Sequence, residues 1–320
     1  MPTKPLYLLG REIHRGRTSL TMDIARLHTR TKIEVPVIVE QGKKPYPVIL
    51  FTAGIHGNEV NGIEIIRQLI AGGYNKPETG TIICIPVVNV FGFLNQSREF
   101  PDGRDLNRLF PGSPTGSLAS RFAYHIMHEI VPQVDYFVDF HTGGASRYNF
   151  PQVRVDFKDH ESLKLAKIFR TRFILNSETR DKSFRETLSK AGKRVLLYEG
   201  GKSLHLDDKI TSQGIEGAIR LLHYLQFHDF SDQISSYEYS QDPVLIRSSA
   251  WIRSNHSGMY RRMVDNGSLV KKGQKLGSIS DPYGDFEKHV KAPRDGFVLA
   301  SNHAPIVTQG DALILLGSLG

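Results

Sequence analysis

The sequence predicts an α/β fold in which a mixed, largely parallel sheet is sandwiched by helices, followed by a small all-β domain. Short, almost continuous apolar runs such as residues 48–54 are typical of strands that are covered on both faces. These runs alternate with segments whose apolar residues have helical spacing, which is the order of an α/β sandwich. After about residue 230 the helical spacing disappears, and short β runs punctuated by Gly and Asp replace it.

The N-terminal part is expected to be extended before the first helix begins. Residues 19–29 and 32–42 mix β-branched and apolar residues in near alternation, and the segment GKKPYP (42–47) predicts a turn. Residues 48–54 predict a buried strand. The segment 58–73 predicts a helix that a glycine pair ends, because its apolar residues recur at helical spacing.

Strands and helices continue to alternate as far as residue 227. Strands are predicted at 81–89, 134–140, 173–177 and 194–201, and helices at 117–131, 160–170, 183–192 and 212–227. Ser117 has the residue type of an N-cap for the helix that follows it. This alternation predicts an α/β domain over residues 1–232.

The C-terminal part predicts a second domain. Residues 231–243 are polar and predict a linker. Short β runs then follow at 244–254, 267–280, 289–301 and 305–317, a pattern typical of a small barrel or sandwich. The predicted all-β domain therefore spans residues 243–320.

Composition and charge argue against several classes of protein. The chain has 320 residues and a net charge of +8, but its basic residues are dispersed, so nucleic acid is not expected as a partner. No apolar run is long enough for a membrane span, and the first residues lack the core of a signal peptide. The single cysteine, Cys84, fits a reducing compartment, so we expect a cytoplasmic protein in which Cys84 has a packing role.

Polar side chains follow three apolar strands at the points where these strands end. His56, with Glu59 three residues later, follows the first, His141 follows the second and Glu199 follows the third. Ligand sites in α/β folds form beyond the carboxyl ends of the strands, so these residues are expected to converge. Two imidazoles and one carboxylate are a catalytic zinc set that leaves one position open for water, and Glu199 would act as the base. The alternative is that each is a polar turn residue, and the pattern alone leaves both interpretations open.

A second polar cluster lies between Ser97 and Gly112. It contains Arg98, Arg104, Asn107 and Arg108 in a loop bounded by Pro and Gly. Arginine binds carboxylates through two parallel hydrogen bonds and stabilises developing oxyanions. For Arg104 we expect an outward, solvated side chain.

Four ordered motifs, AGIHGNE, DLNRLFPG, DFHTG and LLYEGG, resemble those of the succinylglutamate desuccinylase/aspartoacylase family, which has a zinc carboxypeptidase-like fold. The resemblance covers roughly the first 230 residues. The all-β tail is similar to the biotinyl/lipoyl-like domain found in many bacterial members. It has no Met-Lys-Met sequence and Lys288 is off-centre, so a lid or a contact between subunits of a homo-oligomer is expected rather than a carrier role.

The resemblance implies a role for each matched residue. His56, Glu59 and His141 match the ligands of one zinc ion per subunit, and Glu199 matches the general acid/base. The implied substrate contacts are Arg98 for the scissile carbonyl, Asn107 and Arg108 for the substrate carboxylate, and Arg147, Asn149 and Arg154 for a specificity pocket.

The activity implied is zinc-dependent hydrolysis of the amide bond in a small anionic N-acyl amino acid or a related compound. Two alternatives remain: a metallocarboxypeptidase that acts on peptide C-termini, and a non-catalytic member of the fold that binds a small ligand. The presence of all three ligand residues and the base favours catalysis. The acyl group, the amine and the physiological metal cannot be read from the sequence.

Overall fold

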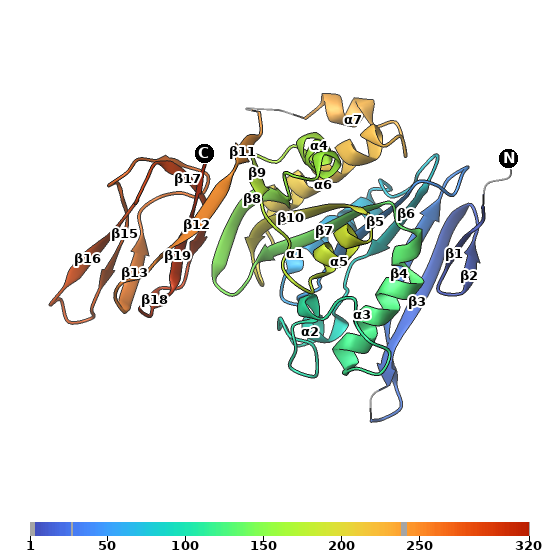
Figure 1. The fold of residues 1–320 in the computed structure, drawn as a ribbon, viewed down its shortest axis with the longest axis horizontal. Helices are drawn as coiled ribbons and strands as arrows, with labels where there is room; N and C mark the ends of the chain where they lie inside the picture. The colour runs from blue at the N-terminus through green and yellow to red at the C-terminus, as the bar shows by residue number, and fades with distance from the viewer. Residues whose placement is uncertain (1–3, 27, 238–241, 320) are drawn as a thin grey trace.

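The computed structural model describes residues 4–26, 28–237 and 242–319. One large sheet runs through these residues (Figure 1). Its strands, in spatial order, are β12 (Ser248–Arg253), β19 (Ala312–Ser318), β17 (Gly296–Asn302), β8 (Arg147–Val155), β10 (Arg194–Lys202), β7 (Tyr136–Gly143), β5 (Val48–Ala53), β6 (Thr81–Ile85), β4 (Lys32–Gln41) and β3 (Gly16–Arg26). Strands β6, β5, β7 and β10 are parallel to one another, whereas β3 and β4 pair antiparallel with their neighbours and β8 pairs antiparallel with β10 and β17, so the predicted mixed sheet is confirmed.

Helices cover both faces of the middle of this sheet. One face carries α1 (Val60–Ala71), α4 (His160–Phe169) and α6 (Asp208–Tyr224), and the other carries α3 (Leu118–Glu129) and α5 (Phe184–Lys190). Side chains alternate along a strand, so Leu50 of β5 packs in the core beneath α3 and α5 while Phe51 packs beneath α1, α4 and α6. This double coverage explains why every residue of β5 is buried.

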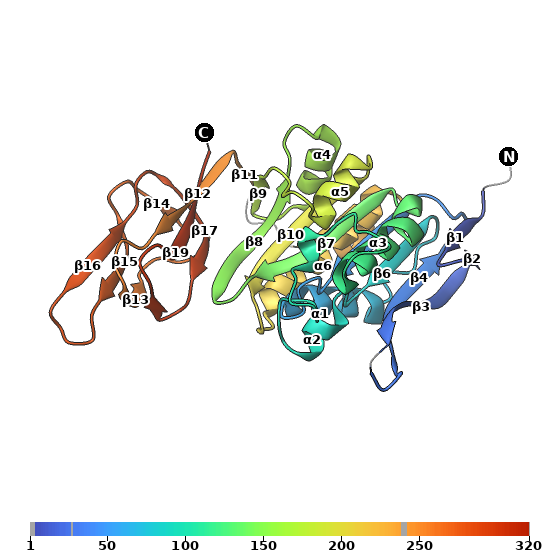
Figure 2. The same ribbon diagram turned by 60° about the horizontal axis from the view of Figure 1, so that its bottom comes forward.

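Smaller strands complete the fold at its two ends. β9 (Phe173–Asn176) pairs with β8 and with β11 (Val244–Ile246), and β14 (Leu269–Val270) pairs with β17. The tail also holds a second sheet of β16 (Glu287–Lys291), β15 (Lys275–Ser280), β13 (Gly258–Arg262) and β18 (Ile306–Val307). Figures 1 and 2 show this sheet at one end of the molecule and the hairpin of β1 (Leu6–Leu8) and β2 (Arg11–Ile13) at the other.

Several predicted boundaries need correction. α1 begins at Val60 rather than near residue 58, and α6 begins at Asp208 because the Asp207 side chain accepts hydrogen bonds from the first N–H groups of the helix. The linker prediction is wrong at its start, where α7 (Ser231–Ser235) forms a short helix. Residues 238–241 of the predicted linker lie outside the described residues.

Two further elements, β8 and α2 (Val90–Leu94), were missed because their sequences do not show the expected pattern. β8 contains Pro151 and several polar residues, which are more typical of a loop, but it forms the link between the central parallel strands and the tail. α2 is a short helix. It lies in an apolar segment directly after the predicted strand 81–89, of which β6 forms the first part. By contrast, the Ser117 side chain caps α3 as expected, through a bond from the Ser120 N–H.

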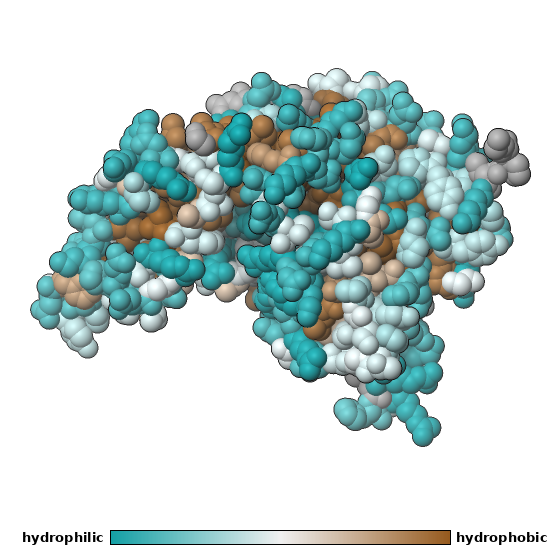
Figure 3. Space-filling model, in the orientation of Figure 1, coloured by the Kyte–Doolittle hydropathy of each residue, from teal (hydrophilic) through white to brown (hydrophobic). Residues whose placement is uncertain are grey.

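Burial and surface character agree with a folded globular protein. Cys84 lies in β6 and is fully buried, and this burial raises the pKa of its thiol to about 12. On the face shown in Figure 3 hydrophilic residues predominate, with hydrophobic residues gathered in patches that include one over the tail. In the part of the chain that the structure describes, no helix is long and apolar enough to cross a membrane.

Candidate active site

The candidate site is built at the carboxyl ends of β5, β7 and β10. These three parallel strands are neighbours, so the residues at their ends lie along one edge of the sheet. Glu199 of β10 is the register partner of His141 of β7, and Ala53, the last residue of β5, is the partner of Phe140. His56 follows Ala53 closely, and all three strands therefore deliver a functional side chain to the same place.

A tight turn after β5 brings His56 and Glu59 together. The Glu59 N–H donates to the His56 carbonyl oxygen over 3.0 Å, and α1 begins at the next residue. Within this turn the Nδ1 atom of His56 lies 2.8 Å from Oε1 of Glu59. Gly57 lets α2 pack closely against the turn, because a Cβ atom there would lie 1.8 Å from the carbonyl carbon of Gly92.

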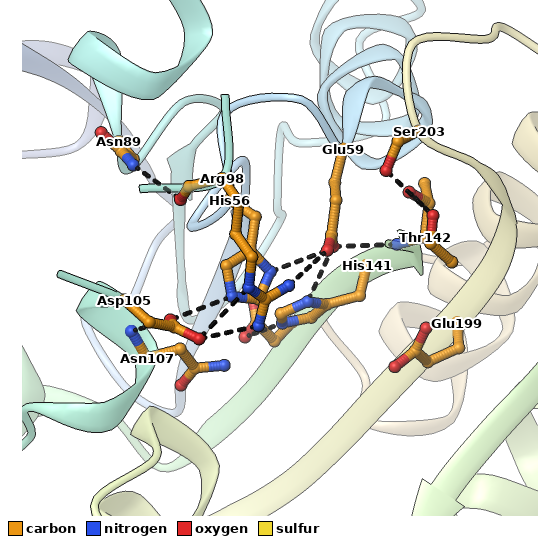
Figure 4. Close-up of polar contacts among 12 residues, drawn as sticks. His56, Glu59, Asn89, Arg98, Asp105, Asn107, His141, Thr142, Glu199 and Ser203 are labelled. Carbon is orange, nitrogen blue, oxygen red and sulfur yellow. Dashed lines mark hydrogen bonds and ion pairs between the residues drawn. The ribbon is translucent and has the colours of Figure 1, made fainter. Parts of the chain in front are cut away.

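His141 completes a three-residue group with His56 and Glu59 (Figure 4). Its Nδ1 atom lies 2.9 Å from Oε2 of Glu59, and the potential ligand atoms of the three residues lie within 4.8 Å of one another. All three side chains are buried. Two imidazole nitrogens and a carboxylate in this arrangement could hold a metal ion, and they are of the donor types found in catalytic zinc sites.

Each histidine is oriented by a second carboxylate on its other ring nitrogen. Nε2 of His141 donates to Asp139 over 2.8 Å, and Nε2 of His56 donates to Asp105 over 3.3 Å. The Thr52 hydroxyl donates to Asp139 over 2.6 Å and holds that carboxylate in place. Such contacts fix the tautomer that leaves Nδ1 free to bind a metal ion.

The charged groups at the centre of the site are arranged to suit a bound cation. Burial would raise the pKa of Glu59, but His56 and His141 outweigh it and hold the pKa well below its usual value. Burial likewise would lower the pKa of His141, but Asp139 and Glu59 raise it well above its usual value. Glu59 is therefore ionised, and its surroundings are adapted to a cation.

Arg98 borders this group on the side of the 3₁₀ helix η1 (Leu106–Arg108). Its Nη2 atom donates to Asp105 over 2.8 Å and its Nη1 atom to Glu59 over 3.4 Å. Asn107 and Arg108 lie on η1 itself, where the side-chain oxygen of Asn107 accepts a bond from the Phe184 N–H over 2.8 Å. This bond ties η1 to the start of α5.

Glu199 lies on the other side of His141 from Asn107 (Figure 4). Its Oε2 atom accepts a 2.6 Å hydrogen bond from the Asn149 side chain, and its Oε1 atom lies 3.7 Å from Nη1 of Arg154. Both partners belong to β8, the antiparallel neighbour of β10. Asn149 and Arg154 therefore contact Glu199 itself, in addition to lining the cavity.

A cavity of about 510 Å³ opens beside these residues. All eight residues of the predicted site line this cavity: His56, Glu59, Arg98, Asn107, Arg108, His141, Arg147 and Glu199. Arg104 is exposed and is not among the residues that line the cavity. Arg147 lies over the Trp251 ring, with its guanidinium carbon 5.6 Å from the ring centroid.

The charge of the cavity lining is strongly unbalanced. Its titratable side chains other than histidine are three carboxylates, Glu59, Asp139 and Glu199, and six arginines, Arg98, Arg108, Arg147, Arg154, Arg180 and Arg185. Partial burial and the nearby charges of Arg108 and Arg154 lower the pKa of Arg180. Burial and the charge of Arg154 lower the pKa of Arg185 to about 10. These guanidinium groups remain cationic near neutral pH, and the cavity attracts anions.

Sequence reasoning missed several residues of this site. Asp139 was detectable, because it precedes His141 by two positions on a strand and must share its face. Asp105 opens the DLNR segment, where it also caps η1 through the Asn107 N–H. Arg180 and Trp251 carry no pattern that marks them, since the folding of loops and the docking of the tail bring them to the cavity.

Comparisons with known proteins agree with this geometry. Residues 45–225 match the model of the succinylglutamate desuccinylase/aspartoacylase catalytic domain. The chain is 28% identical over 307 residues to the N-alpha-acetyl-L-2,4-diaminobutyric acid deacetylase of Halomonas elongata, covering 90% of this chain and 86% of that protein.

Solved structures show the same fold. The product-bound ectoine utilization protein EutE (DoeB) of Ruegeria pomeroyi superposes with a TM-score of 0.84 at 22% identity, covering 99% of this chain and 98% of that one. The succinylglutamate desuccinylase/aspartoacylase of Rhodobacter sphaeroides also gives a TM-score of 0.84, at 23% identity, with 95% of this chain and 96% of that chain covered. The tail is therefore part of a fold shared over the whole chain.

Proposed function

Because the chain belongs to the succinylglutamate desuccinylase/aspartoacylase family, and is thus an amide-bond hydrolase, we propose that it is a zinc-dependent deacylase of small, carboxylate-bearing N-acyl amino acids. The observation that carries this proposal is the group of His56, Glu59 and His141 beside an arginine-rich cavity that also contains Glu199.

The donor set fits zinc. Two imidazole nitrogens and one carboxylate would hold a single ion per subunit, and Asp105 and Asp139 would keep the histidines in the required tautomer. When bound, a zinc ion supplies Lewis-acid chemistry at the amide carbonyl and makes a water molecule acidic near neutral pH.

The remaining steps belong to residues of the chain. Glu199 takes a proton from the attacking water and delivers it to the leaving amine nitrogen as the carbon–nitrogen bond breaks. Asn149 holds the Glu199 carboxylate during this transfer through its 2.6 Å hydrogen bond. Arg98 donates N–H groups to the carbonyl oxygen as negative charge develops there.

Asn107 and Arg108 anchor the substrate carboxylate. Both line the cavity, and the bond from Phe184 to Asn107 gives η1 a fixed position from which to hold an anion. A guanidinium group binds a carboxylate through two parallel hydrogen bonds, which sets the orientation of the amide as well as its affinity.

Replacing Arg108 by lysine tests this anchor. Lysine keeps the charge but not the planar fork, so we expect kcat/KM for carboxylate-bearing substrates to fall about 10- to 100-fold, and that for analogues with a neutral amide in place of the carboxylate to change less than about threefold. Arg104→Lys, in the same loop but exposed, serves as the matched control and should leave both values unchanged. Equal losses for the charged and the neutral series would remove Arg108 from this role.

The surplus of arginines supports a second anionic group in the substrate. Burial and then the nearby charges of Arg108 and Arg154 lower the pKa of Arg180, so these three guanidinium groups lie near one another, and one substrate carboxylate balances only part of their charge. The substrate named for the Halomonas elongata relative keeps a free amino group, which is a cation at neutral pH. We propose that this chain disfavours such a cationic substrate and prefers acidic ones.

A hydrolysis screen tests the function as a whole. N-acetyl and N-succinyl derivatives of aspartate, glutamate, alanine and 2,4-diaminobutyrate, together with longer N-acyl amino acids and short peptides, would be incubated with the protein before and after treatment with a chelator. We expect chelator-sensitive hydrolysis of acidic N-acyl amino acids. Turnover that survives complete metal removal would contradict the metal-dependent mechanism, and a preference for peptides would favour a carboxypeptidase.

We also propose three features that the sequence analysis predicts. These are the division into a catalytic domain (1–232) and an all-β domain (243–320), a cytoplasmic location, and assembly into a homo-oligomer through the tail. The large sheet continues from β8 into β17 of the tail, which supports a tail that is packed firmly on the catalytic part.

A further inference from the structure

The all-β tail supplies one wall of the catalytic cavity. Ser249 and Trp251 of β12 and Leu315 of β19 line it together with the residues described above. Trp251 and Leu315 are register partners on neighbouring strands, so their side chains lie side by side. β17 joins this pair of strands to β8, where Ala300 is the partner of Asn149, the residue that binds Glu199. The tail wall is thus held in register with the catalytic residues.

This wall differs in chemistry from the rest of the cavity. Leu315 and Trp251 pack in one apolar cluster with Leu175, which also lines the cavity. The Arg147 guanidinium covers part of the indole ring at 5.6 Å and is held there by a cation–π interaction. Leu315 and Leu175 are themselves buried in this cluster, so the partly buried indole of Trp251 is the apolar surface that the wall offers, and this surface fits an apolar part of the substrate.

The position of the wall indicates which part of the substrate reaches it. In the sheet order the tail strands are followed by β8, then by β10 with Glu199, and then by β7 with His141. Asn107, to which the proposed function assigns the carboxylate of the amine part, lies on the other side of His141 from Glu199 (Figure 4). A substrate held at Asn107, with its amide at the centre of the site, extends its acyl group toward β8 and the tail.

We infer that Trp251, Leu315 and Arg147 form the subsite for the acyl group, and that this group is an apolar chain longer than acetyl. The inference rests on the proposed function. A cavity of about 510 Å³ also favours a larger acyl group, since it lies within the range of about 300–1,000 Å³ that is typical of sites for drug-sized ligands.

The first test measures kcat/KM for one N-acyl amino acid with acetyl, butyryl and hexanoyl groups. We expect each added methylene to raise kcat/KM about fourfold in the wild-type protein, the ratio that corresponds to burying one methylene group. In Trp251→Ala this increment should fall below about twofold, and Trp251→Phe should restore most of it. In a second series of substrates the acyl group stays the same and the amino acid varies. The dependence of kcat/KM on the amino acid should be the same in the variants as in the wild type.

Ile252→Ala is the matched control. Ile252 follows Trp251 on β12 but packs in the separate core of the tail, so its truncation weakens tail packing without touching the cavity. It should keep the wild-type dependence on acyl length. The inference would be overturned if the wild-type protein preferred acetyl, or if Trp251→Ala kept the full increase in kcat/KM per methylene. It would also be overturned if Trp251→Ala lowered kcat/KM only in the series that varies the amino acid.

A second test does not depend on turnover. Trp251 is the only tryptophan in the sequence, so its fluorescence reports the occupancy of this wall. We expect hexanoate, a product of the proposed hydrolysis, to shift the tryptophan emission of the wild-type protein in a saturable way, whereas the free amino acid product leaves it unchanged. An emission that hexanoate does not alter would overturn the subsite, whereas failure of the hydrolysis screen with a normal hexanoate response would count against the proposed function alone.

Discussion

Glu199→Gln is expected to lower kcat for amide hydrolysis about 10²- to 10⁴-fold while the protein keeps its metal. The reason is chemical: an amide side chain neither accepts the proton of the attacking water nor delivers one to the leaving amine. The substitution preserves shape, because the glutamine oxygen can still accept the bond that Asn149 donates to Glu199 over 2.6 Å. Steady-state kinetics together with metal analysis of the purified variant would measure both effects.

Binding should distinguish this loss from a loss of the site. Removing the negative charge near Arg154 leaves the cavity more positive, so we expect KM for anionic substrates to stay equal or to fall. Glu64→Gln, which alters a glutamate that pairs with Arg67 on α1, controls for a change of charge elsewhere. Near-normal turnover in Glu199→Gln would reject its assignment as the base, and loss of metal in that variant would place Glu199 among the ligands.

The positions of the central site residues follow from one rule that the sequence already exposes. Apolar runs identify β5, β7 and β10 as strands buried between helices, and parallel strands present their carboxyl ends at one edge. The residues that end these runs therefore lie together, whatever their distance along the chain. The turn from His56 to Glu59 is equally local, since the Glu59 N–H bonds to the His56 carbonyl and α1 starts at the next residue.

The partners of these residues depend on pairings that no local pattern encodes. β8 carries Asn149 and Arg154 to Glu199, yet its proline and its polar residues resemble a loop, and only its pairing with β10 and β17 makes it a strand. The same pairing brings Trp251 to the cavity from a part of the chain that was predicted as a separate domain. Long-range strand register, rather than propensity, decides this half of the site.

His56→Ala is expected to abolish stoichiometric metal binding, reducing it from about one ion per chain to near zero. In the proposed site this imidazole is one of three protein ligands. Its loss also removes the ring whose two nitrogens contact Glu59 and Asp105. Metal analysis after gel filtration would measure the occupancy. Added zinc should raise the unfolding temperature of the chelated wild-type protein but not that of the variant, because an ion that binds only the native state stabilises it.

His125→Ala provides the matched control for this substitution. His125 also contacts a glutamate through Nδ1, at 2.6 Å from Glu129, but the pair is exposed on α3 and belongs to no group of three potential metal ligands among the described residues. Its removal should leave metal content unchanged, so a difference between the two variants would reflect the buried group and not a general effect of losing a histidine–glutamate pair. Full occupancy in His56→Ala would mean that Glu59 and His141 hold the ion with other ligands, and the orientation of His56 by Asp105 would then need a different explanation.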